Sequence, residues 1–150
     1  MIKQFFLYLD NHRNMINDKM VDMKELAFRL ERGDDLKKNI EERCKDCTAI
    51  ILCGVGCVYH FKLRMAEATS YMEREENCEI VSLTGTVCRG KAHIHMSLSE
   101  DSGNCLGGHM EYGCLINTTC EVVLGILEEY DAKRSFDEKT GYDEIAFVRK

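Results

Sequence analysis

The sequence has no proline among its 150 residues, no surplus of basic residues and no long apolar run. Without proline it cannot contain an AT-hook, the minor-groove DNA-binding motif with an Arg-Gly-Arg-Pro core. A membrane-spanning helix needs about 20 consecutive apolar residues. The N-terminal cluster Phe5-Phe6-Leu7-Tyr8-Leu9 is far shorter, and no small-residue cleavage site of an export signal follows it. These absences predict a cytoplasmic protein with no membrane partner.

Acidic residues outnumber basic ones by 26 to 20, which gives a net charge of -6. Autonomous DNA-binding proteins usually present a basic face that neutralises phosphates. The densest basic cluster of this chain is interleaved with aspartates and glutamates, so it predicts a solvated surface of mixed charge and no nucleic-acid interface. The basic members of that cluster are Arg29, Arg32, Lys37, Lys38, Arg43 and Lys45.

The nine cysteines are odd in number and follow no export signal, which predicts reduced thiols. Cys44 and Cys47 have the spacing of half a zinc site or of a redox pair, with Cys53 and Cys57 close by in the sequence. Against that interpretation, Cys44 falls on the apolar stripe of a predicted helix and Cys53 in a predicted buried strand, where free cysteine behaves as a small hydrophobic residue. The pattern therefore favours structural thiols.

The length suits one domain, since globular domains mostly contain about 100 to 150 residues. Residues 1–22 carry as many acidic as basic side chains and are rich in asparagine and methionine, so the whole net negative charge lies in residues 23–150. This shift predicts an N-terminal extension over residues 1–22 and a single domain over residues 23–150.

Hydrophobic periodicity predicts strands on either side of one helix. Alternating apolar residues between Lys24 and Leu30 are typical of a half-buried strand. Residues 35–45 form the predicted helix, with an apolar stripe at Leu36, Ile40 and Cys44. The continuous apolar run at 49–58 predicts a strand buried on both faces. Further strands are expected at 59–64, 78–87, 91–99, 105–110, 119–127 and 132–136. The predicted fold class is α+β, with a mostly antiparallel sheet and flanking helices.

Three histidines carry the clearest chemical signal. His93 and His95 are two residues apart on a predicted strand, so their side chains project to the same face. The turn Glu100–Gly103 should pair the next strand with this one and bring His109 beside them. Three neutral imidazoles suit Zn²⁺ or another divalent first-row metal, with a fourth position left for a ligand. The alternative is a set of exposed or hydrogen-bonded histidines without metal.

Because an imidazole binds metal only when it is neutral, occupancy of such a site should fall as the pH drops through about 6 to 6.5. His12 and His60 have no comparable partners and are expected to be surface or packing residues.

A catalytic set is incomplete in the sequence. Glu111 is the one candidate general base near the histidines, and its alternative role is that of a surface or hydrogen-bonding carboxylate. Spacing places no second carboxylate, lysine or nucleophile beside them, so the sequence favours a non-catalytic module. A metal-dependent enzyme that uses the open coordination position is the alternative.

Several segments, in their order and spacing, resemble the prokaryotic branch of the PPC (plants and prokaryotes conserved) domain family, which accompanies AT-hooks in plant nuclear proteins. The segment before Met23 and the cysteine-rich residues 44–57 depart from the family pattern. The resembling segments are residues 28–34, 78–87, 93–99, 103–109, 119–123 and 137–144.

This resemblance implies an α+β fold with a largely antiparallel sheet, a homotrimer, and a metal site at His93, His95 and His109. Family members of this kind are described as DNA-binding by analogy with the plant proteins. Since this chain has no AT-hook, the resemblance implies a homotrimeric metal-binding module with a DNA-associated or regulatory role. DNA or a DNA-bound protein is the partner class that it leaves open.

Overall fold

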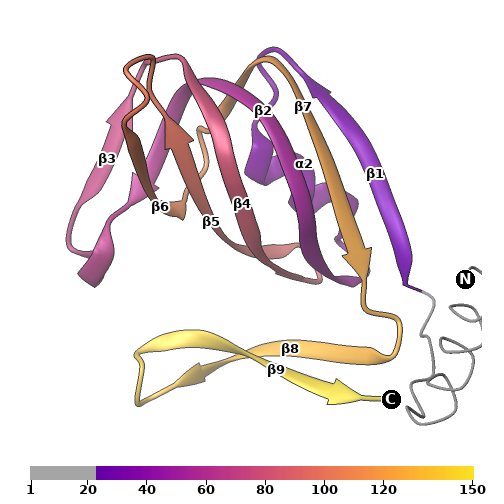
Figure 1. The fold of residues 1–150 in the computed structure, drawn as a ribbon. Helices are drawn as coiled ribbons and strands as arrows, with labels where there is room; N and C mark the ends of the chain where they lie inside the picture. The colour runs from indigo at the N-terminus through magenta and orange to yellow at the C-terminus, as the bar shows by residue number, and fades with distance from the viewer. Residues whose placement is uncertain (1–22) are drawn as a thin grey trace, which may run out of the picture.

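A computed structural model describes residues 23–150 of the chain (Figure 1). The predicted N-terminal extension over residues 1–22, with His12, lies outside the described residues. One α-helix, one short 3₁₀ turn and nine strands follow one another in the described part. They are β1 (Lys24–Glu31), α2 (Leu36–Arg43), β2 (Thr48–Arg64), η1 (Ala66–Ala68), β3 (Tyr71–Arg74), β4 (Cys78–Cys88), β5 (Lys91–Ser99), β6 (Cys105–Met110), β7 (Leu115–Ile126), β8 (Tyr130–Asp137) and β9 (Tyr142–Arg149).

The predicted α+β class with flanking helices is wrong, because residues 23–150 form a β-rich fold with a single α-helix. The antiparallel sheet itself is present. Within residues 23–150, apolar residues at helical spacing are found around Leu36 and Ile40, whereas most of the later segments have the apolar residues and two-residue period of strands. The sheet curls over its own core, so one helix is enough to cover the apolar side chains that remain.

The main sheet has seven strands, with the order β1-β7-β2-β4-β5-β6 and with β3 attached to β2. All its pairings are antiparallel, and near its end β2 also pairs with β6, at Leu63↔Met110 and Arg64↔His109. This extra pairing closes part of the sheet on itself around a continuous hydrophobic core. Figure 1 shows the curled sheet with α2 at its inner side.

Helix α2 lies within the predicted span of 35–45 and is shorter, because it begins at Leu36 and ends at Arg43. The side chain of Asp35 is the N-cap and accepts a hydrogen bond from the backbone N–H of Lys38 at 3.0 Å. Such a cap satisfies one of the helix's free N–H groups. Leu36 and Ile40 are fully buried, so the helix packs through the predicted apolar stripe.

Strand β2 differs from its prediction in two ways. The separate strands expected at 49–58 and 59–64 form one strand, Thr48–Arg64. The strand is not buried on both faces, because Leu52 and Val55 are 46% and 52% exposed and Cys53 is also exposed. β-Bulges lie between Ile51 and Cys53 and again after Gly56. Bulges rotate a strand, and no element of the described residues covers the apolar side chains that face outward here.

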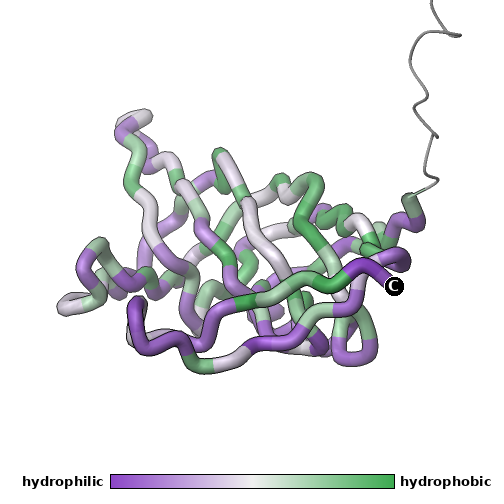
Figure 2. The backbone as a smooth tube through the Cα atoms, turned by 90° about the horizontal axis from the view of Figure 1, so that it is seen from below, coloured by the Kyte–Doolittle hydropathy of each residue, from purple (hydrophilic) through white to green (hydrophobic). Residues whose placement is uncertain are grey.

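The last two strands, β8 and β9, form a separate antiparallel hairpin that lies across one side of the main sheet. Figure 2, viewed from that side, shows the hairpin in front with hydrophobic and hydrophilic residues mixed along it. An ion pair of 2.7 Å joins Arg89 to Asp131, and the thiol of Cys88 donates to the carbonyl of Ala132 at 3.2 Å. The hairpin thereby brings Tyr142 of β9 close to the end of β2.

No helix within residues 23–150 has both the length and the apolar character that a membrane crossing requires.

Candidate metal centre

Strands β5 and β6 place the three histidines. On β5, Ile94 and Met96 are buried in the core. His93 and His95 alternate with them along the strand and therefore project from the opposite face. The backbone N–H of Gly103 donates to the carbonyl of Glu100 at 2.9 Å and closes the predicted turn. The hairpin register then sets His109 directly opposite His95. Directly opposed residues of antiparallel strands point to the same face, which brings the third imidazole to the other two.

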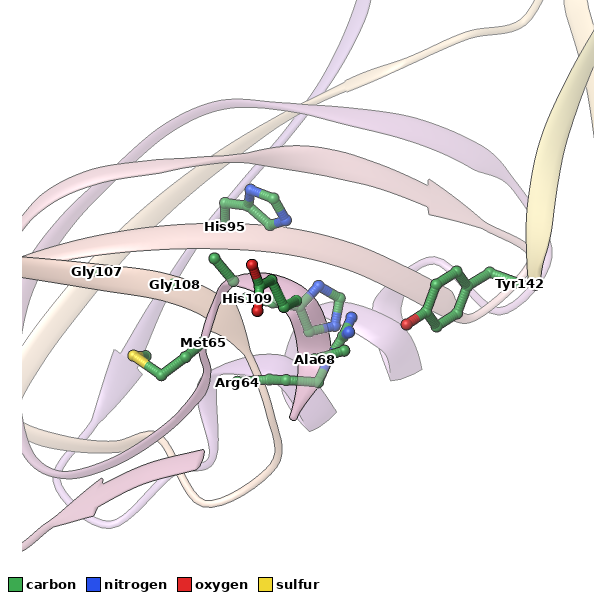
Figure 3. A pocket seen from close by; sticks show the side chains of 10 residues that line it. Arg64, Met65, Ala68, His95, Gly107, Gly108, His109 and Tyr142 are labelled. Carbon is green, nitrogen blue, oxygen red and sulfur yellow. The ribbon is translucent and has the colours of Figure 1, made fainter. Parts of the chain in front are cut away.

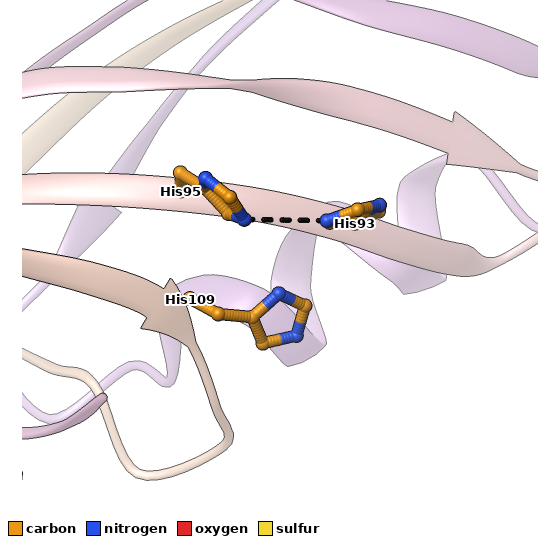
Figure 4. A group of neighbouring side chains, drawn as sticks. All are labelled: His93, His95 and His109. Carbon is orange, nitrogen blue, oxygen red and sulfur yellow. Dashed lines mark hydrogen bonds between the residues drawn. The ribbon is translucent and has the colours of Figure 1, made fainter. Parts of the chain in front are cut away.

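The three imidazole rings lie against one another (Figure 4). Ring centroids are 5.1 Å apart for His93 and His95, 5.0 Å for His93 and His109, and 5.5 Å for His95 and His109. Each ring offers one nitrogen to a common space, and these three atoms lie within 4.8 Å of one another. Within residues 23–150, this is the cluster of side chains whose ligand atoms converge as a metal site requires.

The donor set fits a divalent metal ion. Ligands about 2.0–2.1 Å from a tetrahedral ion are about 3.3–3.4 Å apart, and the Nε2 atoms of His93 and His95 are separated by 3.3 Å. The three ligand nitrogens lie within 4.8 Å of one another, which is a wider limit than the spacing around one tetrahedral ion. Rotation of the exposed His93 or His95 ring would bring all three nitrogens to one ion.

His109 supplies an independent test of that fit. Its Nδ1 atom is buried and has no hydrogen-bond partner among the described residues, and Figure 4 shows the His109 ring directed toward the other two histidines. Buried polar atoms without partners are rare in folded proteins. A metal ion held by the three rings would satisfy this nitrogen.

The surroundings keep two of these histidines neutral. Burial, helped by the positive charges of Arg64 and Lys37, lowers the pKa of His109 to about 4. Partial shielding from water and the neighbouring His95 also lower the pKa of His93. A neutral ring has a free lone pair, so both residues are in the ligand form at neutral pH.

Behind His109 lies a small group of charged side chains. Oε1 of Glu111 is 4.0 Å from Nε2 of His109, and the same carboxylate is 3.8 Å from Nζ of Lys37 and 3.6 Å from Nε of Arg64. A carboxylate on this side favours the proton on Nε2 and leaves the Nδ1 lone pair for a ligand. Glu111 is therefore placed to orient His109.

Lys37 corrects the sequence analysis, which assigned it to a solvated surface. It is only 6% exposed, and its ammonium group donates to the carbonyl of Met110 at 3.0 Å. It also lies 4.9 Å from the ring centroid of Tyr112. These contacts and Glu111 compensate for removing the charge from water, which the charge pattern of the sequence could not reveal.

A cavity of about 670 Å³ opens beside His95 and His109 (Figure 3). Its charged lining residues are Arg64 and Glu67, and neither was singled out from the sequence. Arg64 lies far from the histidines along the chain, and only the pairing of β2 with β6 brings them together. Tyr142 of the C-terminal hairpin also lines the cavity, with its ring centroid 5.6 Å from the Arg64 guanidinium carbon.

The cysteines and His60 do not form a second metal site among the described residues. Cys44 is buried, and burial with the adjacent Cys47 raises its pKa to about 12, so it persists as a thiol rather than as a metal-binding thiolate. Cys53, predicted to be buried, is exposed. His60 is a packing residue, with Nδ1 at 2.7 Å from the carbonyl oxygen of Gly113.

Residues 18–128 match the family pattern of the Plants and Prokaryotes Conserved (PCC) domain. Two curated relatives are bifunctional GlmU proteins of Synechococcus sp., strains JA-2-3B'a(2-13) and JA-3-3Ab, at 35% and 36% identity over 126 residues. Each match covers 82% of this chain, which spans about a fifth (20%) of the relatives' own length.

Solved structures share the fold. A hypothetical protein from Salmonella enterica has a TM-score of 0.81 at 27% identity, with 88% of this chain and 98% of that chain covered. A metal-containing protein from Archaeoglobus fulgidus has a TM-score of 0.67 at 31% identity, with 85% and 98% covered. A protein from Bacteroides thetaiotaomicron, named as a proposed DNA-binding protein, has a TM-score of 0.72 at 19% identity, with 86% and 99% covered.

Proposed function

Because the chain belongs to the Plants and Prokaryotes Conserved (PCC) domain family, we propose that it is a metal-binding module whose His93, His95 and His109 hold one divalent first-row metal ion. The observation that carries this proposal is the convergence of three imidazole nitrogens within 4.8 Å, one of them buried without a partner. The metal-containing relative from Archaeoglobus fulgidus supports it.

Zn²⁺ is the proposed ion, since it favours imidazole ligands and a tetrahedral arrangement. When bound, it would supply a Lewis-acidic position open to one further ligand. His109 would face Glu111 through Nε2 and the ion through its Nδ1 lone pair, and the neutral forms of His93 and His109 would avoid the cost of displacing protons.

Metal analysis of the untagged protein tests this assignment. The wild-type protein should contain one metal ion per chain, and replacing His95 or His109 by alanine should each abolish stoichiometric metal. His60→Ala serves as the matched control, because His60 binds a backbone carbonyl outside the cluster. Retention of metal by both cluster variants, or its loss from the His60 variant, would contradict the three-histidine site.

Self-association is the second part of the proposal, with a homotrimer as the assembly. The exposed apolar side chains on the outer face of β2 and β4 support it, because large apolar patches on a surface mark interaction sites. Leu52, Val55 and Val81 are 46%, 52% and 57% exposed. The proposed unit of assembly is the domain of residues 23–150, with residues 1–22 as an extension.

DNA, or a protein bound to DNA, is the proposed partner class, and the name of the Bacteroides thetaiotaomicron neighbour is its support. The net charge of -6 argues for a bound protein as the direct contact. Electrophoretic mobility shifts at two salt concentrations test direct binding, since contacts to phosphates weaken steeply with salt. A mobility shift of DNA that needs no second protein and weakens as the salt concentration rises would favour direct contact between this chain and DNA.

A metal-dependent enzyme is the alternative function, and the cavity beside the centre is the observation that favours it. The candidate base Glu111 lies on the Nε2 side of His109 and is tied to Lys37 and Arg64. Glu67, which lines the cavity, is the carboxylate on the accessible side. Hydrolysis of generic ester or phosphoester substrates that a chelator abolishes would favour the enzyme over the module.

A further inference from the structure

We propose that the cavity beside the three-histidine centre binds one small oxyanion, with a carboxylate or phosphate group held by Arg64 and directed at the open position of the centre. This inference rests on the proposed metal site and names the class of ligand that completes it. It is carried by the placement of Arg64, by the charge balance behind His109 and by the lining of the cavity.

The fold fixes where Arg64 lies. Arg64 and His109 are paired across β2 and β6, and paired residues of antiparallel strands have Cβ atoms about 4.5–5.5 Å apart on one face. The Arg64 side chain is 23% exposed, so it is partly shielded from water. Figure 3 shows it at the floor of the cavity, between His109 and Tyr142.

The charges behind His109 do not balance. Glu111 is the one acidic side chain of the described residues within ion-pair distance of Lys37 and of Arg64, at 3.8 and 3.6 Å. Two cations therefore share one carboxylate. One positive charge is left in a partly buried site, where a charge is costly unless it is paired. A bound oxyanion supplies that pair.

The geometry of the guanidinium group leaves room for such a ligand. Glu111 approaches Nε of Arg64, while the Tyr142 ring lies 5.6 Å from the guanidinium carbon. The ion pair with Glu111 uses Nε of Arg64 and leaves the two terminal nitrogens for a ligand in the cavity that Arg64 lines. A planar guanidinium binds carboxylate and phosphate through two parallel N–H groups, so the terminal edge of Arg64 suits an oxyanion.

The remaining lining limits the charge of the ligand. Backbone and short side chains at Gly107, Gly108, Ala66 and Ala68 leave a cavity of about 670 Å³. Glu67 is exposed in the same lining and repels further negative groups. The site therefore favours a ligand with one anionic group over a polyanion such as a nucleic acid.

The test uses the whole 150-residue chain in two metal-loaded forms. The Co²⁺ form is followed by visible absorption, which reports changes in the ligands of the ion, and the Zn²⁺ form is used for calorimetry. Inorganic phosphate and acetate are titrated separately at constant ionic strength, and the arm with the tighter binding identifies the preferred group. We expect a saturable change in the Co²⁺ spectrum of the wild-type protein. Arg64→Gln should weaken the oxyanion at least tenfold, and Arg64→Lys should weaken it less because it keeps the charge.

Lys62→Met is the matched control, because it removes a cation from the same strand. Lys62 pairs with Glu73 at 2.8 Å and does not line the cavity. Tyr142→Leu provides a second variant if Arg64→Gln does not fold, and it should weaken binding several-fold. Metal content is measured for every variant. Stoichiometric metal with no saturable response, or equal responses in wild type and the Arg64 variants, would overturn the oxyanion site alone. Absence of metal from the wild type would overturn the proposed function itself.

Discussion

Arg64 and His109 are cross-strand partners on β2 and β6, although β3, β4 and β5 lie between them in the sequence. Their pairing closes the curled sheet and sets a guanidinium group beside an imidazole. The two charged residues behind that imidazole, Lys37 and Glu111, come from α2 and from the end of β6. The site thus depends on the closure of the sheet as well as on the histidine hairpin.

Closure of the sheet depends on Gly108. A Cβ atom there would lie 2.8 Å from the carbonyl oxygen of Arg64 and 2.9 Å from Cε of Met65. Gly108→Ala should therefore push β6 away from β2, lower the free energy of unfolding by about 1–3 kcal/mol and weaken metal binding. Thermal unfolding and metal titration measure the two effects. Val148→Ala, at an exposed position on the C-terminal hairpin, should change neither, and a Gly108→Ala protein with wild-type metal affinity would show that closure does not matter.

Glu111 should act on the metal through His109. Glu111→Gln removes the charge that favours the proton on Nε2, so the dissociation constant for Zn²⁺ should rise about 10- to 100-fold. Competition with a chromophoric chelator measures this constant. Glu79→Gln, at an exposed position on β4, removes the same charge elsewhere and should leave the affinity unchanged. An unaltered affinity in the Glu111 variant would assign that residue to ion pairing alone.

The stability of the metal-free protein should depend on pH through His109. Its native pKa is lowered to about 4, mainly by burial, from the ordinary value of 6.5. Between these values the unfolded chain binds more protons, so stability is complete above about pH 6.5 and falls as the pH drops toward 4, by at most about 3 kcal/mol from this residue. Urea unfolding across this range measures the change.

His109→Asn should flatten that pH dependence, whereas His60→Asn should not. For the same reason, proton competition at His93 and His109 should begin at lower pH than the 6 to 6.5 expected from the sequence, because both native pKa values are lowered. Loss of metal that follows His109 protonation near pH 6.5 would contradict the buried environment of this ring.

The exposed face of β2 should control self-association. Replacing Leu52 and Val55 together by lysine introduces charge into the apolar surface, so the proposed homotrimer should dissociate. Light scattering at micromolar concentration gives the mass of each protein. Val148→Lys, at an exposed position on the C-terminal hairpin, is the control and should leave the mass unaltered. A wild-type protein with the mass of a monomer would refute self-association.

Asp35 should contribute to stability through two contacts. Its carboxylate caps α2 through the N–H of Lys38 and accepts a second hydrogen bond from the N–H of Gly113 at 2.6 Å. Asp35→Ala should lower the free energy of unfolding by about 1–3 kcal/mol. Chemical denaturation measures this loss against Asp46→Ala, whose position is exposed. Equal stability of the two variants would show that the cap is dispensable.

The sequence by itself determined the local elements and the histidine pair. Alternation along β1 and β5 and the stripe at Leu36 and Ile40 predicted their structure correctly, because these patterns record which side of an element is buried. Strand parity placed His93 and His95 on one face, and the Glu100–Gly103 turn predicted the partner strand of His109. Each of these inferences needs only neighbours that are close in sequence.

Tertiary structure alone decided what surrounds the histidines and how the sheet closes. Lys37 has the composition of a surface residue and is buried because Glu111 and the carbonyl of Met110 meet it there. The apolar run around Leu52 resembles an interior strand and is exposed because bulges turn it outward and no second helix within residues 23–150 covers it. Such outcomes depend on pairings between distant strands, whose energies are set by the whole packed sheet rather than by local periodicity.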